Sequence, residues 1–433
     1  MDAFEEYLQS ALGAEAASVA LKALETEPSV AVRLNPFKKG PSFEGAEPVP
    51  WSPNGLILGN RPSFTLDPFF HGGAYYVQDS SAQFVSYIAR QFMQGERLCV
   101  LDLCAAPGGK TTDLAASLRE AVGDHFLLVA NEVMKLRASA LAANVARWGD
   151  PNVAVTSADP SAFSRLEGFF DMIVADVPCS GEGMFRKDEK ARQQWSPDNV
   201  ALCAARQRRI LSDVWDALAP GGVLVYSTCT FNSLENDDNV AWAAETLGAR
   251  ILSPECPFPG IIRTRHGFSL VPGFVKGEGQ YCAALRKEGG RPFRAKEKAV
   301  PKDNCPLLDI PVSIRRRGET LVAVPLEVAS GVEALQPLHP LCSGVALGVM
   351  KGKDLVPDAD LALSTALKAD AFTVAHVDRE TALRFLHRDS VSVNAHRGII
   401  LVAYEGCPLG FVKNLGTRCN NLLPMSRRIL MDV

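Results

Sequence analysis

The sequence lacks several features that would assign it at once to a structural class. It has no apolar run long enough to span a bilayer, so a chain built on transmembrane helices is excluded. Its eleven cysteines include no Cys-x-x-Cys pair, so we expect neither a zinc site nor a disulfide framework, and no metal. The net charge of −4 excludes a globally basic nucleic-acid coat. The odd number of cysteines and the acidic start, unlike a signal peptide, predict a cytoplasmic protein.

The sequence does have a regular alternation of apolar strands and helices, which begins near residue 98. Its length of 433 residues, with 47% hydrophobic residues, is enough for two or three domains. Strands are predicted near 98–103, 126–130, 152–155, 171–175 and 222–227, and helices near 111–120, 135–147 and 199–218. This alternation predicts a mostly parallel, doubly wound α/β sheet. The stretch from Phe268 to Leu285 is predicted to add an antiparallel edge.

The stretch from Val100 to Lys110 is a buried strand followed by a tight glycine turn and the start of a helix. Such a turn brings backbone N–H groups close to a ligand. Its spacing matches neither the dinucleotide fingerprint nor a phosphate-binding loop. Glu132 and Asp159 follow the next two strands, where carboxylates can accept ribose hydroxyls and an adenine amino group. Together these features favour S-adenosylmethionine over NAD or ATP.

Two cysteines follow the last two parallel strands, at the edge where open α/β sheets carry out their chemistry. Cys179 comes three residues after Asp176, and Cys229 follows Thr228. Carbon 5 of a pyrimidine is a poor nucleophile until a thiolate adds to carbon 6. After carbon 5 has taken a methyl group, a base must remove its proton before the thiolate can leave. A thiol pair beside a methyl donor therefore indicates C5 methylation, and spacing alone does not rank the two thiols.

Asp176 suits the same reaction, because a carboxyl group there can hydrogen-bond the N3/N4 edge of a cytosine and stabilise the intermediate.

Three motifs now carry a resemblance to a known family. The runs 102–111 and 176–188, and the run 226–231 followed by Glu235 and Asn236, resemble the NOL1/NOP2/Sun family of RNA cytosine-5 methyltransferases. The resemblance spans roughly residues 30–290. The segment from Gly183 to Asp188, with the C-terminal extension, is most similar to the RsmF/YebU branch, which modifies small-subunit (16S) ribosomal RNA.

The resemblance implies a fold and a set of site residues. The fold would be a Rossmann-like class I methyltransferase sheet with a small N-terminal α+β RNA-binding region and a C-terminal α+β, PUA-like extension. Cys229 would be the nucleophile, Cys179 would assist elimination and product release, Asp176 would position the base, and Lys110 would lie near the target base. S-adenosylmethionine would contact Cys104, Ala105, Ala106, Pro107, Gly108, Gly109, Lys110, Glu132, Asp159 and Asp176.

The same resemblance implies a domain order and partners. The predicted segments are 1–74 (RNA-binding region), 75–288 (methyltransferase domain), 289–306 (basic linker), 307–375 (RsmF-type C-terminal domain) and 376–433 (PUA-like RNA-binding module). We expect a monomer that acts on 16S ribosomal RNA, free or within the small subunit, and does not bind membranes. Two alternatives are open: a tRNA or multi-substrate methyltransferase with the same chemistry, and a non-catalytic RNA-binding ribosome-assembly factor.

Overall fold

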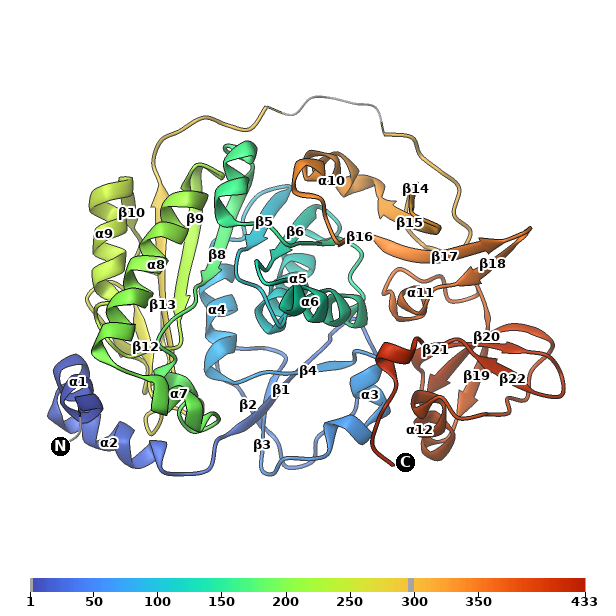
Figure 1. The fold of residues 1–433 in the computed structure, drawn as a ribbon, viewed down its shortest axis with the longest axis horizontal. Helices are drawn as coiled ribbons and strands as arrows, with labels where there is room; N and C mark the ends of the chain where they lie inside the picture. Colours follow the sequence, from blue (N-terminus) through green and yellow to red (C-terminus); the bar gives the residue numbers. More distant parts are fainter. Residues whose placement is uncertain (1–2, 295–299, 433) are drawn as a thin grey trace.

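The computed structural model describes residues 3–294 and 300–432, in which four β-sheets form with helices packed around the largest (Figure 1). The fold is of the predicted class. A Rossmann-like central sheet follows an N-terminal α+β region and precedes two smaller sheets. Residues 295–299 of the predicted basic linker lie outside the described residues. The described parts of that linker, 289–294 and 300–306, form no helix or extended strand.

The central sheet is built on parallel strands in the order β9-β8-β5-β6-β7. They are β5 (Leu98–Asp102), β6 (Phe126–Asn131), β7 (Val153–Thr156), β8 (Phe170–Asp176) and β9 (Leu218–Thr228). The antiparallel edge beyond β9 consists of β13 (Gln280–Lys287), β12 (Phe268–Leu270), β11 (Ile262–Arg263) and β10 (Ala249–Ile251). The predicted strands and the antiparallel edge are confirmed, although β9 begins at Leu218 rather than at residue 222.

Strand β6 shows why the sheet is covered on both faces. All of its residues are buried, and successive side chains point to opposite faces. Leu127 and Val129 pack in one apolar cluster with α8 (Pro197–Trp215) and α9 (Asp237–Leu247). Leu128 and Ala130 pack in the other with α4 (Phe84–Arg90), α5 (Gly109–Val122) and α6 (Lys135–Trp148). A strand buried on both faces needs a continuous apolar run, which is what the sequence shows.

One helix differs at both ends from its predicted bounds. The helix expected over 199–218 begins at Pro197, because Ser196 Oγ accepts a hydrogen bond from Asn199 N at 3.1 Å. It ends at Trp215, since β9 starts three residues later. The short helical turn that precedes α4 begins at Ser81, and its N-cap residue Ser80 makes no side-chain capping hydrogen bond. The carboxylate of Asp79 accepts from Ser81 N at 3.0 Å instead.

The N-terminal region combines a helical hairpin with a small sheet in the order β2-β3-β1-β4 (Figure 1). Its elements are α1 (Ala3–Leu12), α2 (Ala14–Leu24), β1 (Val30–Leu34), β2 (Glu47–Pro48), β3 (Gly55–Leu58), α3 (Pro68–His71) and β4 (Tyr75–Val77). Phe4 and Leu8 of α1 pack against Phe185 and Phe231, which follow β8 and β9. Strand β4 pairs with β1, although the predicted boundary after residue 74 separates them.

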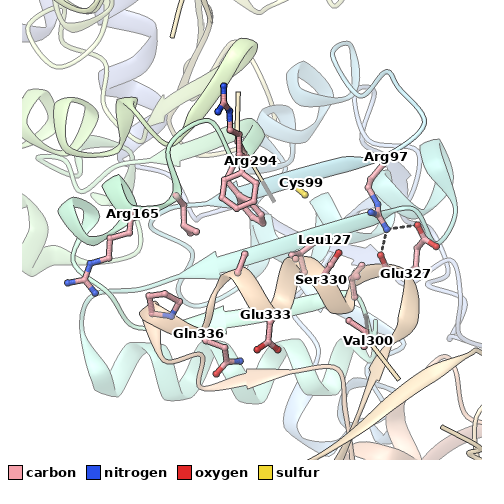
Figure 2. Close-up of a pocket in the computed structure, with 17 residues that line it drawn as sticks. Arg97, Cys99, Leu127, Arg165, Arg294, Val300, Glu327, Ser330, Glu333 and Gln336 are labelled. Atoms are coloured by element: carbon pink, nitrogen blue, oxygen red, sulfur yellow. Dashed lines mark hydrogen bonds and ion pairs between the residues drawn. The ribbon is translucent and has the colours of Figure 1, made fainter. Parts of the chain in front are cut away.

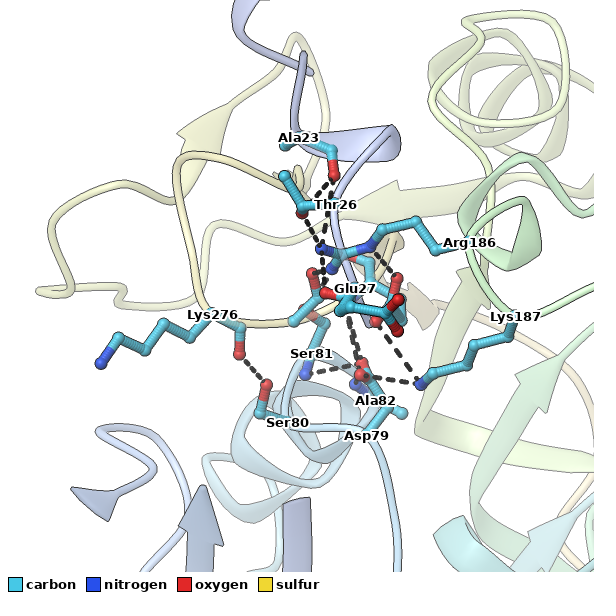
Figure 3. A network of polar contacts seen from close by, with 12 residues as sticks. Ala23, Thr26, Glu27, Asp79, Ser80, Ser81, Ala82, Arg186, Lys187 and Lys276 are labelled. Atoms are coloured by element: carbon cyan, nitrogen blue, oxygen red, sulfur yellow. Dashed lines mark hydrogen bonds and ion pairs between the residues drawn. The ribbon is translucent and has the colours of Figure 1, made fainter. Parts of the chain in front are cut away.

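A buried ion pair lies where this region meets the central sheet (Figure 3). Arg186 Nε lies 2.7 Å from Glu278 Oε2, and the two side chains are only 7% and 4% exposed. The same guanidinium donates to the carbonyl of Gly277 at 2.8 Å and to Thr26 Oγ1, just after α2, at 3.2 Å. Glu278 N donates to Asp79 Oδ2 at 3.2 Å. The N-terminal helices, the loop after β8 and the β12–β13 connection therefore meet at one arginine.

Replacing Arg186 with alanine should lower the free energy of unfolding by about 3–5 kcal/mol, because Glu278 would keep a buried charge without its main partner. Urea unfolding followed by tryptophan fluorescence measures this. Arg192→Ala is the matched control, since its ion pair with Glu25 is exposed and should contribute less than about 1 kcal/mol. Equal losses of unfolding free energy in the two variants would contradict a stabilising role for the buried Arg186–Glu278 ion pair.

The C-terminal part forms two four-stranded sheets within the described residues. The first contains β14 (Val312–Arg317), β15 (Thr320–Pro325), β17 (Val345–Lys351) and β18 (Asp354–Pro357), and the second contains β19 (Thr373–Val377), β20 (Gly398–Tyr404), β21 (Cys407–Asn414) and β22 (Cys419–Asn421). The helices are α10 (Ala329–Ala334), α11 (Ala359–Leu363) and α12 (Arg379–His387). The predicted boundary after residue 375 falls within β19.

The C-terminal part also adds a strand to the central sheet. Strand β16 (Cys342–Ser343) pairs antiparallel with β7, so the outer edge of the parallel sheet is covered by residues from the far end of the chain. Tyr404 stacks edge-on against Phe69 of α3, with ring centroids 5.2 Å apart. Arg379 donates to the carbonyl of Leu66 at 2.9 Å. The C-terminal part therefore contacts both the central sheet and the N-terminal region.

Candidate active site

The glycine turn after β5 lies at the carboxyl edge of the parallel sheet. Asp102 ends β5, and its Oδ2 accepts a hydrogen bond from Thr111 Oγ1 at 2.7 Å, which joins the two ends of the turn. Gly108 has a φ of 112°, in the left-handed region that favours glycine, and it caps α5. A Cβ at Gly108 would lie 3.2 Å from Leu141, so a larger residue would press this turn against α6. The segment from Cys104 to Lys110 is thereby held in one tight arc.

Asp102 is fully buried, and burial raises the pKa of its carboxyl from 3.8 to about 7. The unfolded chain releases this proton near pH 4 and the folded chain near pH 7, so stability falls as the pH rises between these values. Asp102→Asn removes the titration, and above pH 7 the variant should be the more stable by up to about 4 kcal/mol. Urea unfolding at pH 5, 6.5 and 8 measures the difference, with the exposed Asp370→Asn as control. If the stability difference between the variant and the wild type does not grow with pH, the raised pKa of Asp102 is contradicted.

Asp176 and Lys110 form an ion pair across the sheet edge. Lys110 Nζ lies 2.9 Å from Asp176 Oδ2, and the side chains are 15% and 28% exposed. Ser227 Oγ donates to Asp176 Oδ1 at 2.8 Å, and Gln280 Nε2 approaches the same oxygen at 3.3 Å. Although burial lowers it, the pKa of Lys110 is raised overall by the negative charges of Asp176 and of Cys229. A lysine ammonium, a carboxylate and a cysteine thus share one half-buried site.

The two cysteines meet beside this ion pair. Cys179 follows β8, Cys229 follows β9, and their sulfur atoms lie 3.1 Å apart. The hydrogen bond with Cys229, and then burial, raise the pKa of the Cys179 thiol well above its usual value. Two thiols in contact do not both ionise readily, because the second thiolate would face the first. Cys179 is accordingly the member of the pair that keeps its proton.

The two carboxylates predicted to hold an adenosine differ in surroundings. Glu132 directly follows β6 and is only 3% exposed; its Oε1 accepts from Met134 N at 2.9 Å. Arg137 Nη1 lies 3.3 Å from its Oε2. Asp159 lies three residues beyond β7 rather than at its end. Its exposed carboxylate accepts from Ser161 N and Oγ, and these hydrogen bonds lower its pKa.

Sequence reasoning missed a set of buried polar side chains behind the cysteines. Glu182 and Glu235 are at most 1% exposed, and burial raises the pKa of both carboxyls. Their hydrogen-bond partners include Trp195, Gln207 and Asn232. Glu235 and Asn236 were part of a quoted motif, but only the fold shows that they contact the cysteine loops. Nothing in the sequence pointed to Gln280 as a site residue, because it reaches Asp176 from the antiparallel strand β13.

A cavity of about 650 Å³ lies elsewhere, under α10 (Figure 2). Arg97 and Cys99 line it at the start of β5, and Leu127 lines it from β6. It therefore opens at the amino edge of the parallel strands, whereas the cysteines lie at the carboxyl edge. None of the candidate site residues occurs among its described lining residues.

Comparison with known proteins now gives the family. Residues 91–286 match the family described as 16S rRNA methyltransferase RsmB/F, residues 1–80 match the N-terminal domain of 16S rRNA methyltransferase RsmF, and residues 372–429 match the methyltransferase RsmF PUA domain. The ribosomal RNA small subunit methyltransferase F of Citrobacter koseri is 32% identical over 89% of this chain and 85% of that protein. The chain belongs to the ribosomal RNA small subunit methyltransferase F family. It is therefore an RNA methyltransferase with an RNA-binding PUA domain.

A second family member agrees with this assignment, and two solved structures share the fold. The methyltransferase F protein of Shewanella loihica is 30% identical over 87% of this chain and 83% of its own length. A methyltransferase homolog protein from Pyrococcus horikoshii has a TM-score of 0.55 and 26% identity, covering 66% of this chain and 94% of its own. NSun6 of the same organism, solved with SFG, has a TM-score of 0.55 at 21% identity and shares the fold, covering 66% and 97%. In the described parts of this methyltransferase F family member, no helix has the length and apolarity needed to cross a membrane.

Proposed function

We propose that this protein methylates carbon 5 of a cytosine in 16S ribosomal RNA, with S-adenosylmethionine as the methyl donor, through a transient bond between Cys229 and carbon 6. Family membership supports small-subunit ribosomal RNA as the substrate class. The observation that carries the finer chemistry is the pair of sulfur atoms 3.1 Å apart beside the Lys110–Asp176 ion pair. A binding-only protein has no need for such a pair. The expected cytoplasmic location and monomeric state stay predictions.

Cys229 is the better nucleophile of the two thiols. Cys179 keeps its proton, because its pKa is raised by the hydrogen bond with Cys229 and by burial. Lys110 attracts negative charge on Cys229, as the effect of Cys229 on the Lys110 pKa indicates. Cys229 then adds to carbon 6, and the electron pair of the double bond becomes available at carbon 5.

The Lys110–Asp176 pair suits the polar edge of cytosine. Asp176 presents an acceptor and Lys110 a donor, side by side at 2.9 Å. Cytosine offers the complementary pattern, with an amino donor at N4 and an acceptor at N3. Uracil has a carbonyl at position 4 and would place it against the Asp176 carboxylate. Contacts to N3 also stabilise the negative charge that develops in the ring when carbon 6 is attacked.

The loop after β5 fits the expected donor, which supplies an electrophilic methyl group on a positively charged sulfur. Asp102 Oδ1 is buried beside this loop without a hydrogen-bond partner, and the Asp176 carboxylate lies 2.9 Å from Lys110 Nζ, so two carboxyl groups border the loop. Cys104, Ala105, Ala106, Pro107, Gly108, Gly109 and Lys110 would hold the donor from the loop, and Glu132, Asp159 and Asp176 from the strand ends. Small side chains in the arc leave the backbone accessible.

Cys179 suits the final step. Once Cys229 is bonded to carbon 6, it no longer shares a proton with Cys179 and no longer competes for negative charge, so the pKa of Cys179 falls. Cys179 can then release its own proton to solvent, and the resulting thiolate accepts the proton from carbon 5. The electron pair of the broken C–H bond re-forms the C5–C6 double bond, and Cys229 leaves as a thiolate.

Incubation with isotope-labelled S-adenosylmethionine tests the proposal. Naked 16S RNA, small ribosomal subunits and bulk tRNA are compared, and the modified nucleoside is identified by mass spectrometry. We expect 5-methylcytidine in 16S RNA. Label confined to tRNA would favour the tRNA alternative, and label at any atom other than carbon 5 of cytosine would overturn the proposed chemistry.

A further inference from the structure

We propose that Glu235 and Asn236 are positioning residues that together set the distance between the two cysteine sulfurs, Glu235 by holding the Cys179 loop and Asn236 by holding the Cys229 loop. The inference rests on the proposed function, because it assigns the two residues to the two halves of that reaction. We call the two side chains the sulfur brace. They directly precede α9 and are 0% and 3% exposed.

Glu235 holds the residues on both sides of Cys179. Its Oε2 accepts a hydrogen bond from Ser180 N at 3.0 Å and another from Gln207 Nε2 at 2.7 Å. The same Gln207 Nε2 also donates to the carbonyl of Pro178 at 3.0 Å. The peptide groups before and after Cys179 are thus fixed by one buried carboxylate and its amide partner. Charged hydrogen bonds of this kind are stronger than neutral ones.

Asn236 holds the residues on both sides of Cys229 in the same way. Thr228 Oγ1 donates to Asn236 Oδ1 at 2.6 Å, and Asn236 Nδ2 donates to the carbonyl of Thr230 at 3.0 Å. One amide therefore uses both its acceptor and its donor on the two neighbours of the sulfur. A hydrophobic residue or an acid at this position would leave at least one of these groups unpaired.

The brace has a rigid base. Tyr226 donates through its hydroxyl to the carbonyl of Glu235 at 2.6 Å. Asp237, the next residue, accepts from Tyr281 at 2.7 Å and from Thr264 at 2.8 Å. Because Glu235 and Asn236 are consecutive and anchored, the Cys179 and Cys229 loops do not move apart independently. Their side chains act through neighbours of the cysteines, so we assign them positioning roles.

The two halves of the brace should fail in different ways. Glu235→Gln puts an amide N–H against a donor in either orientation, from Ser180 and Gln207 or from Asn232, so it loosens the Cys179 loop. RNA should then stay covalently bound to Cys229, with turnover lowered roughly ten- to a hundred-fold. Asn236→Ser cannot span Thr228 and Thr230, and should slow formation of the bond to RNA without accumulation. Glu245 is exposed on α9, so Glu245→Gln is the matched control and should behave as wild type.

A second measurement needs no RNA and separates the brace from the proposed reaction. The oxidant diamide takes two electrons and two protons from a pair of thiols and leaves a disulfide. In the wild-type protein we expect rapid joining of Cys179 and Cys229, detected by peptide mapping. The two brace variants should join them at least about ten-fold more slowly. Joining at the wild-type rate in either variant overturns the brace. If the two variants form the disulfide slowly but the wild-type protein methylates no RNA, the brace is supported and the proposed function is overturned.

Discussion

Replacing Cys229 with alanine is expected to lower methylation by at least about a thousand-fold, because no other group can form the bond to carbon 6. The neighbouring Cys179 does not substitute, since its pKa is raised and the sulfur brace holds it in its own loop. Methyl transfer from labelled S-adenosylmethionine to small-subunit RNA measures the loss. No covalent protein–RNA complex should appear on a denaturing gel.

Cys256→Ala is the matched control for this result. Cys256 is a half-buried thiol on the loop after β10 and lies outside the candidate site, so its removal should leave activity within about two-fold. Retained methylation in the Cys229 variant would show that a different group attacks the ring.

Replacing Cys179 with alanine is expected to have the opposite effect on the complex. The bond to Cys229 can still form and carbon 5 can still be methylated, but removal of the C5 proton loses its nearby base. RNA should remain attached to the protein, approaching one RNA per chain, and turnover should fall by roughly a hundred-fold or more. A denaturing gel with labelled RNA shows the complex directly. A single round of methyl transfer should survive.

The reverse pattern would exchange the two roles. If Cys229→Ala traps RNA and Cys179→Ala does not, then Cys179 is the nucleophile and the ammonium of Lys110 serves a different purpose. The double variant is the control for both assignments, because it should neither trap RNA nor methylate it under either of them.

The parallel sheet could be predicted from sequence because its strands carry a pattern that few other structures need. The run of β6 is apolar at every position before Asn131, as a strand covered on both faces requires. The ends of α8 were less predictable. Its start depends on the hydrogen bond that Ser196 Oγ accepts from Asn199 N, and its end depends on where β9 begins.

The site was predictable to the extent that its residues are close in sequence to strand ends. The loop after β5, Asp176 and the two cysteines could be placed at one edge by topology alone. The 3.1 Å separation of the sulfurs could not be predicted, because it depends on Glu235 and Asn236. Gln280 could not be found at all, since its contact joins residues 104 positions apart.

The pairing of β16 with β7 has a consequence for how a substrate is chosen. Because a strand of the C-terminal part belongs to the catalytic sheet, the PUA domain is not suspended on a free tether. An RNA that touches both the PUA domain and the cysteine pair must present its target at a fixed distance and angle from the site bound by the PUA domain. Selection among many cytosines would then follow the three-dimensional shape of the RNA, and the nucleotides beside the target would matter less.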